Sequence, residues 1–296
     1  MNPNLPPAPL QRLHLSWLSA AGIEAAILRL DLIDPLISGN KWFKLQHHLL
    51  AAQAAGHEGL ISLGGAHSNH LHALAAAGKR LGFATVGLLR GHPLQTPTVI
   101  DLQTMGMTLH WLGYQGYRER YAPGFWEPWQ ARYPTLLPVP EGGGGVLGAQ
   151  GCAALLEQVN AQLPALEWAD FDGWWLPVGT GTTLAGLVLA ERGRRWVHGA
   201  MAVPSRHGVH EQVIALCGTQ GYSLIDASRG GFAKTDDRLL AFMRQAGEES
   251  GVPLEPVYTA KALWALHEAV ERGALKRGTR LVFVHTGGLQ GWRGSH

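Results

Sequence analysis

Residues 173–187 read GWWLPVGTGTTLAGL, and this stretch decides the fold class. The apolar run 173–178 is typical of a buried strand, whereas residues 183–192 favour a helix. The turn between them is rich in glycine. Backbone N–H groups and the helix N-terminus at such a turn can bind a phosphate, and threonine hydroxyls add donors. The predicted phosphate cradle consists of Gly179, Thr180, Gly181, Thr182 and Thr183.

The spacing of this cradle favours a monophosphate as the ligand. A dinucleotide fingerprint needs a further glycine where this chain has Leu184, and an acidic residue about twenty positions later, which is missing. A Walker loop needs Gly-Lys-Ser/Thr, and the cradle lacks it. The alternative reading is a tight turn between a strand and a helix that binds no ligand.

Strands and helices alternate on both sides of the cradle, which indicates βαβ units and parallel sheets. We therefore predict an α/β fold of two three-layer lobes with mostly parallel twisted sheets and a ligand cleft between them. Residues 44–150 would form a small inserted domain, and residues 1–43 with 151–296 a larger one. The predicted strands cover residues 27–33, 59–63, 84–90, 107–112, 173–178, 196–203, 222–225 and 280–285.

A candidate reactive lysine, Lys41, follows Ser38-Gly39-Asn40 at the start of a predicted helix. Turn and cap formers of this kind end the preceding strand and begin the helix. A lysine there faces the positive end of the helix dipole, which favours the neutral amine that an imine-forming lysine needs. The alternative is a solvated surface lysine.

Three other turns carry candidate site residues. In Gly64-Gly-Ala-His-Ser-Asn-His70, Ser68 and Asn69 offer donors for a carboxylate or a phenolic oxygen, or they only cap the helix. Residues 285–288 end a strand where ligand crevices lie, or they form a plain left-handed turn. Tyr258 is a candidate acid or base, or a packed tyrosine.

Composition excludes several classes of function. A net charge of +2 argues against an electrostatic nucleic-acid binder, and a content of only 16% charged residues argues against a disordered chain. The two cysteines, Cys152 and Cys217, are isolated, and we expect ordinary buried thiols in a reducing compartment. No stretch has the length of a membrane span, and the proline-rich N-terminus lacks the pattern of a signal peptide. We therefore expect a soluble cytoplasmic protein without nucleic-acid or membrane partners and without a metal site.

A reactive lysine beside a monophosphate cradle points to pyridoxal 5′-phosphate (PLP). Five motifs carry a resemblance that runs from Ser38 to Gly288. They are SGNKWFK (38–44), GGAHSNH (64–70), VGTGTTLAG (178–186), PVYTAK (256–261) and VHTGG (284–288). With these motifs the chain resembles the family of 1-aminocyclopropane-1-carboxylate (ACC) deaminase and D-cysteine desulfhydrase. These are PLP enzymes of the tryptophan-synthase-β fold type, fold type II.

The resemblance implies a role for each motif. Lys41 would bind PLP as an imine and act on the substrate α-proton. Asn69 would bond the ring oxygen, and residues 179–183 the phosphate. Thr286 would face the pyridine nitrogen, and Tyr258 would be a second acid or base. Ser68 would bind the substrate carboxylate or take part in proton transfer. Asn69, His70 and Phe232 would also bind the substrate.

Departures from the family pattern bear on the substrate. ACC deaminases carry Glu where this chain has Thr259, and they lack the threonine of VHTGG; both positions resemble the desulfhydrase branch. A second family tyrosine corresponds to Phe232, which cannot donate a proton, and Phe43 stands where many members have arginine.

The sequence therefore predicts a PLP-dependent lyase for a small amino acid, in the manner of D-cysteine desulfhydrase. Alternatives are ACC deaminase and a PLP-binding protein with little turnover. The resemblance also implies a homodimer.

Overall fold

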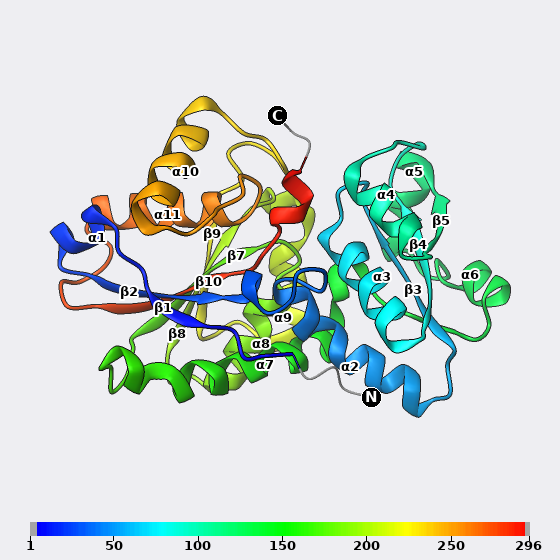
Figure 1. Cartoon of the computed structure of the whole chain (residues 1–296), viewed down its shortest axis with the longest axis horizontal. Helices are drawn as coiled ribbons and strands as arrows, with labels where there is room; N and C mark the ends of the chain where they lie inside the picture. Colours follow the sequence, from blue (N-terminus) through cyan, green and yellow to red (C-terminus); the bar gives the residue numbers. More distant parts are fainter. Residues whose placement is uncertain (1–4, 294–296) are drawn as a thin grey trace.

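The computed structural model describes residues 5–293, so the first four residues of the proline-rich N-terminus lie outside it. Within these residues the strands form two sheets, which lie side by side in Figure 1. The larger sheet has six strands in the order β1-β2-β10-β7-β8-β9. Their bounds are β1 Leu10–Arg12, β2 Glu24–Arg29, β10 Arg280–His285, β7 Gly173–Val178, β8 Trp196–Met201 and β9 Tyr222–Asp226.

The larger sheet is buried on both faces because alternate side chains of its strands enter two different cores. In β10, Leu281 and Phe283 pack with one face, and Val282 and Val284 with the other. Only β1 runs antiparallel to its neighbour. Figure 1 shows helices on both sides of this sheet. One side carries α1 (Ser16–Ala21), α10 (Asp237–Ser250) and α11 (Thr259–Glu271), and the other α7 (Gly145–Gln162), α8 (Thr182–Glu191) and α9 (Val209–Cys217).

The smaller sheet is wholly parallel and has the same three-layer build. Its order is β5 (Thr108–Trp111), β4 (Ala84–Leu89), β3 (Gly59–Gly64) and β6 (Leu136–Pro138). One face packs on α2 (Asn40–Ala54), α3 (Asn69–Leu81) and α4 (Pro97–Thr104), and the other on α5 (Gly113–Arg118) and α6 (Glu127–Arg132). Short 3₁₀ helices are η1 (Leu30–Leu32), η2 (Glu119–Tyr121), η3 (Glu141–Gly143), η4 (Leu163–Leu166), η5 (Ser205–His207) and η6 (Leu289–Trp292).

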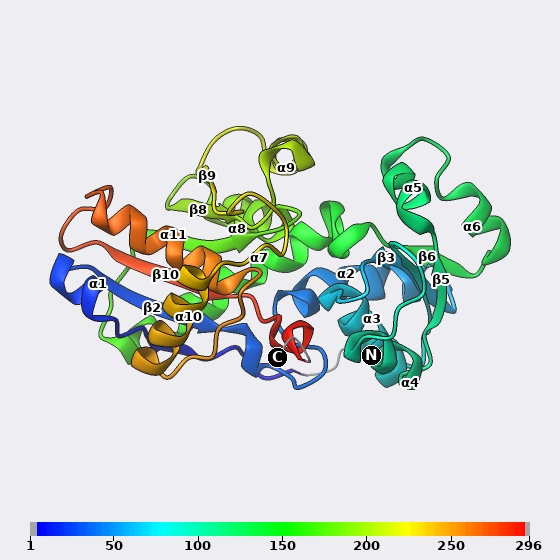
Figure 2. The same cartoon turned by 90° about the horizontal axis from the view of Figure 1, so that it is seen from above.

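The predicted α/β fold with two three-layer units is thereby confirmed. Its smaller sheet comes from residues 59–138, inside the segment predicted as an inserted domain. The domain boundaries themselves, at residues 43/44 and 150/151, stay a prediction. Helix α2 joins the two units: it follows the turn of the larger sheet at Ser38 and packs on both α7 and α3 (Figure 2).

The functional turns meet because they follow the carboxyl ends of parallel strands. The turn at Ser68 follows β3, the cradle follows β7, and Thr286 follows β10. A Cβ added to Gly288, after β10, would lie only 3.1 Å from Asn69 Nδ2 at the start of α3. The strand ends of the two sheets therefore face each other across a short gap.

Several predictions at the level of elements need correction. The predicted strand 27–33 ends at Arg29, and residues 30–32 form a 3₁₀ turn whose Asp31 side chain lies buried under the site. The strands β1 and β6 and helix α1 had no clear sequence signal because they are short. Cys152 is a buried thiol as expected, but Cys217 is only partly buried; both are free.

Length and hydropathy of the helices bear on the membrane prediction. Across residues 5–293, none of the helices is both long and apolar enough to cross a membrane.

Candidate active site

Lys41 lies in the first turn of α2, as the motif predicted, and Asn40 connects it to the cradle. Lys41 Nζ donates to Asn40 Oδ1 at 2.8 Å, and Asn40 Nδ2 donates to Thr183 Oγ1 at 2.8 Å. Of the three predicted turn and cap formers, Gly39 is the N-cap, and the Asn40 side chain makes no capping bond. The buried amide instead orients the lysine amine toward residues that are 143 positions away in sequence.

A second lysine of the same motif reaches the cradle directly. Lys44 is buried, and its Nζ donates to Thr180 Oγ1 at 3.3 Å. The Thr180 and Thr182 hydroxyls share a hydrogen bond of 3.0 Å. Within residues 5–293 neither Lys41 nor Lys44 forms an ion pair with a carboxylate. Two neighbouring amines at a turn of hydroxyls and backbone N–H groups therefore suit an anionic ligand.

The glycine-rich segment 141–145 covers the cradle from the side of the smaller sheet. A Cβ added to Gly142 would lie 3.0 Å from Thr180 Cγ2, and one added to Gly143 would lie 3.0 Å from Lys44 Cβ. Both residues have positive φ angles, 68° and 71°. Glycine at these positions thus permits a backbone approach that any side chain would obstruct.

Tyr258 stands at the N-terminus of α11, against the first glycine of the cradle. A Cβ added to Gly179 would lie 3.3 Å from Tyr258 Cε1 and 3.7 Å from its hydroxyl oxygen. The Phe232 ring lies beside Tyr258, with ring centroids 6.0 Å apart and planes at 61°. Burial, followed by the charge of Glu255, raises the pKa of Tyr258, so its hydroxyl stays protonated at neutral pH.

Glu255 organises the loop that carries Tyr258. Its carboxylate accepts hydrogen bonds from three backbone N–H groups, those of Val257, Tyr258 and Thr259. The Thr259 hydroxyl accepts from the backbone N–H of Glu255 at 2.9 Å and is fully buried. Burial raises the pKa of Glu255, and the three backbone bonds oppose that rise. These hydrogen bonds fix the conformation of the loop, and Thr259 takes part in them.

The turn before α3 supplies polar groups from the smaller sheet. Ser68 caps α3 by accepting from Leu71 N at 3.2 Å, which is the alternative role expected for it. Asn69 Oδ1 and His70 Nδ1 are buried and have no hydrogen-bond partner among residues 5–293. Ser62 donates to Val139 O, so His70 Nε2 donates to Ser62 Oγ at 2.7 Å and His70 Nδ1 is left as an acceptor. Burial holds the pKa of His70 well below its ordinary value.

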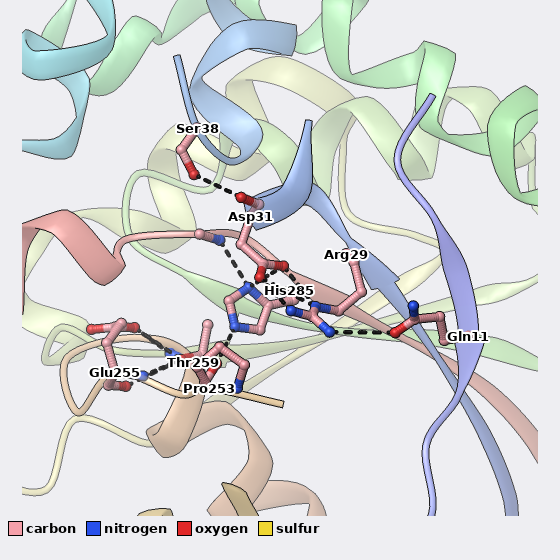
Figure 3. A network of polar contacts seen from close by, with 9 residues as sticks. Gln11, Arg29, Asp31, Ser38, Pro253, Glu255, Thr259 and His285 are labelled. Atoms are coloured by element: carbon pink, nitrogen blue, oxygen red, sulfur yellow. Dashed lines mark hydrogen bonds and ion pairs between the residues drawn. The ribbon is translucent and has the colours of Figure 1, made fainter. Parts of the chain in front are cut away.

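A buried charge network under the site joins the segments of Lys41 and Thr286, and Figure 3 shows it. Asp31 accepts from Arg29 at 2.7 Å and contacts His285 Nδ1 at 3.1 Å, while His285 Nε2 donates to Pro253 O at 2.8 Å. Burial would raise the pKa of Asp31, but hydrogen bonds from His285 and Arg29 lower it to about 2.

Above this network, Asn40 N donates to Thr286 O at 3.2 Å. Thr286 is itself buried, and Gly39 has no room for a side chain, because a Cβ there would lie 2.1 Å from Thr286 O. The segment that carries Lys41 and the strand end at Thr286 are thereby fixed to each other.

Comparison with known proteins decides the family. The family model described as pyridoxal-phosphate dependent enzyme matches residues 2–287. The chain belongs to this family. A Pyrococcus furiosus protein, provisionally named a 1-aminocyclopropane-1-carboxylate deaminase, is 30% identical over 91% of this chain and 86% of its own length. The bifunctional mitochondrial D-cysteine desulfhydrase/1-aminocyclopropane-1-carboxylate deaminase of Arabidopsis thaliana is 26% identical over 96% of this chain and 77% of its own.

The fold of this PLP-dependent enzyme has a matching solved structure. The crystal structure of an ACC deaminase homologue superposes with a TM-score of 0.80 at 26% identity, over 96% of this chain and 90% of that one. The predicted family, fold type and cofactor are thus confirmed.

The residues present fit PLP. The amines of Lys41 and Lys44, which have no carboxylate partners in the described part of the chain, suit an aldehyde and a phosphate dianion. The unpaired Asn69 Oδ1 and His70 Nδ1 mark a place where a ligand would complete the hydrogen bonding. In this arrangement Lys41 would hold the cofactor covalently, and Lys44 with the cradle would hold its phosphate. Thr286 would lie toward its pyridine nitrogen.

The structure brings the predicted residues of both sheets together and adds three that sequence reasoning missed, Lys44, Glu255 and Asp31. The sequence could have indicated Lys44 as a site residue, because it lies three residues after Lys41 in the same motif and so on the same helix face. Asp31 had no such signal, since its partner His285 lies far away in sequence, and Glu255 had none, because its partners are backbone N–H groups, which carry no sequence signal. Phe43 is buried in the core, where arginine would be costly.

The pKa of Lys41 gives a first testable prediction. Burial, with the charge of Lys44 second, lowers this pKa to about 7. Below pH 7 the neutral fraction of the amine, which is the reactive form, should rise about tenfold per pH unit and then level off. Reductive methylation of the apoprotein, followed by mass spectrometry, measures this. The exposed Lys276 is the control. A pH profile of Lys41 labelling that coincides with the profile of Lys276 labelling would contradict the prediction.

Proposed function

We propose that this enzyme is a D-cysteine desulfhydrase-like lyase. It would convert a small amino acid with a thiol at Cβ, together with water, into pyruvate, ammonia and hydrogen sulfide. The Cα–H and Cβ–S bonds break, and hydrolysis of the resulting enamine releases ammonia. Bound PLP supplies the electron sink for the electron pair left at Cα.

The residues of the chain divide the remaining work. The Lys41 amine, with its pKa of about 7, is suited to take the α-proton at neutral pH. The N–H groups at the start of α3, with Ser68 and Asn69, suit the substrate carboxylate. The unpaired His70 Nδ1 accepts a hydrogen bond from a substrate donor. The protonated Tyr258 hydroxyl serves as the acid on the side of the cradle.

One observation carries the choice of substrate: Phe232, without a hydroxyl, lies where Tyr258 would otherwise have a phenolic partner. A thiolate leaves readily because the pKa of a thiol is about 8.5, so one acid is enough. Opening the ring of ACC breaks a carbon–carbon bond, and its carbon leaving group needs more assistance. The resemblance adds Thr259 in place of the Glu of ACC deaminases, which supports the same choice.

The test is a comparison of substrates. Pyruvate release is measured with D-cysteine, β-chloro-D-alanine and ACC at equal concentrations. We expect the two substrates with good leaving groups to react at least about tenfold faster than ACC, a difference that corresponds to about 1.4 kcal/mol in the barrier. If ACC reacts fastest, the proposal is wrong.

ACC deaminase is the second candidate. The name of the Pyrococcus furiosus relative favours it, whereas the Arabidopsis thaliana relative is named for both activities. The variant Phe232→Tyr, which restores a phenol beside Tyr258, tests the two candidates against each other. On the first proposal it should increase ACC turnover relative to D-cysteine turnover. An ACC-specific wild-type enzyme that loses activity with this change would support the second candidate instead.

A homodimer and a cytoplasmic location also belong to this proposal. Both rest on the family resemblance and on the composition of the chain. Light scattering of the purified protein tests the dimer, because a monomeric mass would reject it. Fractionation of cells that make the protein tests the location.

A further inference from the structure

A buried lysine outside the cofactor site holds the turn that presents Phe232. Lys261 lies in the first turn of α11 and is 1% exposed. Its Nζ donates to the carbonyl oxygens of Ser228 at 2.9 Å and Gly231 at 3.1 Å. Burial lowers the pKa of Lys261 to about 8. The ammonium and the neutral amine can both donate two hydrogen bonds, so the contact holds in either form.

The conformation of the 228–234 turn needs this support. Arg229 and Ala233 have φ angles of 52° and 57°, in the left-handed region that side chains disfavour. A cavity of about 290 Å³ lies behind the turn, between it and α11, lined by Arg229, Gly230, Lys261 and Trp264 among others. The turn therefore lacks close packing on that side, and hydrogen bonds have to hold it in place.

Arg229 makes a second contact between the turn and α11. Its guanidinium lies 4.7 Å from the centre of the Trp264 ring and pairs with Asp236 at 2.6 Å. Asp236 is mostly solvated, so this pair contributes little. Lys261 is the buried anchor of the turn.

The same helix end also carries Tyr258, three residues before Lys261. Tyr258 begins α11, and Phe232, which is 46% exposed, lies beside its ring. We propose that Lys261 is a positioning residue for substrate selectivity, because it holds the 228–234 turn so that Phe232 forms a fixed wall beside Tyr258. This inference rests on the proposed function, in which these two rings face the substrate.

A fixed wall would limit the size of the substituent at the substrate Cβ. Removing the anchor lets the turn move into the cavity behind it and opens the wall. A difference of one methylene in a pocket changes selectivity by about 10- to 200-fold. Loss of the wall should therefore change the selectivity between small and large Cβ substituents by about tenfold, the lower end of this range.

The experiment compares Lys261→Met with Lys276→Met, a control at an exposed lysine. The first measurement is limited trypsin digestion of the full-length holoenzyme, because Arg229 and Lys234 are potential cleavage sites within the turn. Lys261→Met should increase cleavage at these two sites about tenfold, a change of about 1.4 kcal/mol in the opening of the turn, with little change elsewhere. This digest needs no substrate, so it reports on the turn independently of the proposed function.

The second measurement is the ratio of kcat/KM for D-cysteine to that for S-benzyl-D-cysteine. Lys261→Met should lower this ratio about tenfold, mainly through KM. Phe232→Ala should give a similar loss, and the double variant should lose no more than either single one, because Lys261 acts through Phe232.

Two results overturn the inference. One is an unchanged digest at Arg229 and Lys234. The other is a selectivity loss that adds to that of Phe232→Ala. The first of these results, together with a lower melting temperature, would make Lys261 a general stabiliser. If Lys261→Met does not fold, Lys261→Gln replaces it, because glutamine is polar but too short to reach both carbonyls. Lys261→Gln should then also increase cleavage in the turn and lower the selectivity ratio.

Discussion

Replacing Lys41 with alanine should lower the rate of pyruvate formation by at least about a thousandfold, because the variant lacks both the amine that binds the cofactor and the proposed base. The loss should be chemical rather than structural. Lys41 is only partly exposed, and its known contact is the single hydrogen bond to Asn40, so the fold should tolerate a smaller side chain. Steady-state kinetics with added PLP, together with circular dichroism, separates the two possibilities.

The matched control for this prediction is Lys276→Ala, at an exposed position far from the cradle in sequence. It should keep full activity. Retention of more than about a tenth of the wild-type rate in Lys41→Ala would show that another group removes the α-proton. Lys44→Ala should instead weaken the binding of PLP, since the amine of this lysine donates to Thr180 of the phosphate cradle.

Replacing Tyr258 with phenylalanine should lower kcat/KM about a hundredfold or more, which is the usual effect of losing a general acid. The change removes one hydroxyl and keeps the ring that packs on Gly179 and Phe232. Cofactor absorbance and thermal stability should therefore stay close to those of the wild type. The measurement is the kinetics with D-cysteine, compared with β-chloro-D-alanine.

The better leaving group is the internal control for Tyr258. Chloride needs no proton to leave, so Tyr258→Phe should harm the reaction of β-chloro-D-alanine less than that of D-cysteine. An equal loss with both substrates would mean that Tyr258 positions the substrate and does not act as the acid. A normal rate with both would remove it from the mechanism.

The sequence predicted those parts of the site that local patterns encode. A glycine-rich turn after a buried strand fixes the cradle, and a cap-forming turn before a helix places Lys41. The local pattern did not show the role of the Asn40 side chain. This side chain bonds Lys41 and Thr183, and a bond to a residue 143 positions away leaves no periodic signal.

The groups that hold the site together escaped sequence reasoning for the same reason. Asp31 looked like part of a strand, because nothing nearby in sequence indicates that it pairs with His285 from the last strand. Lys261 looked like an ordinary helix residue, since its partners are two backbone carbonyls, which carry no sequence signal. Long-range polar contacts of this kind become visible only when the fold is known.

The most direct test of the account is the identity of the residue that binds the cofactor. The wild-type enzyme is incubated with PLP, reduced with borohydride, digested with trypsin and analysed by mass spectrometry. We expect one reduced pyridoxyl group, on Lys41 in the peptide 30–44, where trypsin then fails to cleave after the labelled lysine. A label on Lys44 or Lys261 in place of Lys41, or no label on any lysine, would contradict the account.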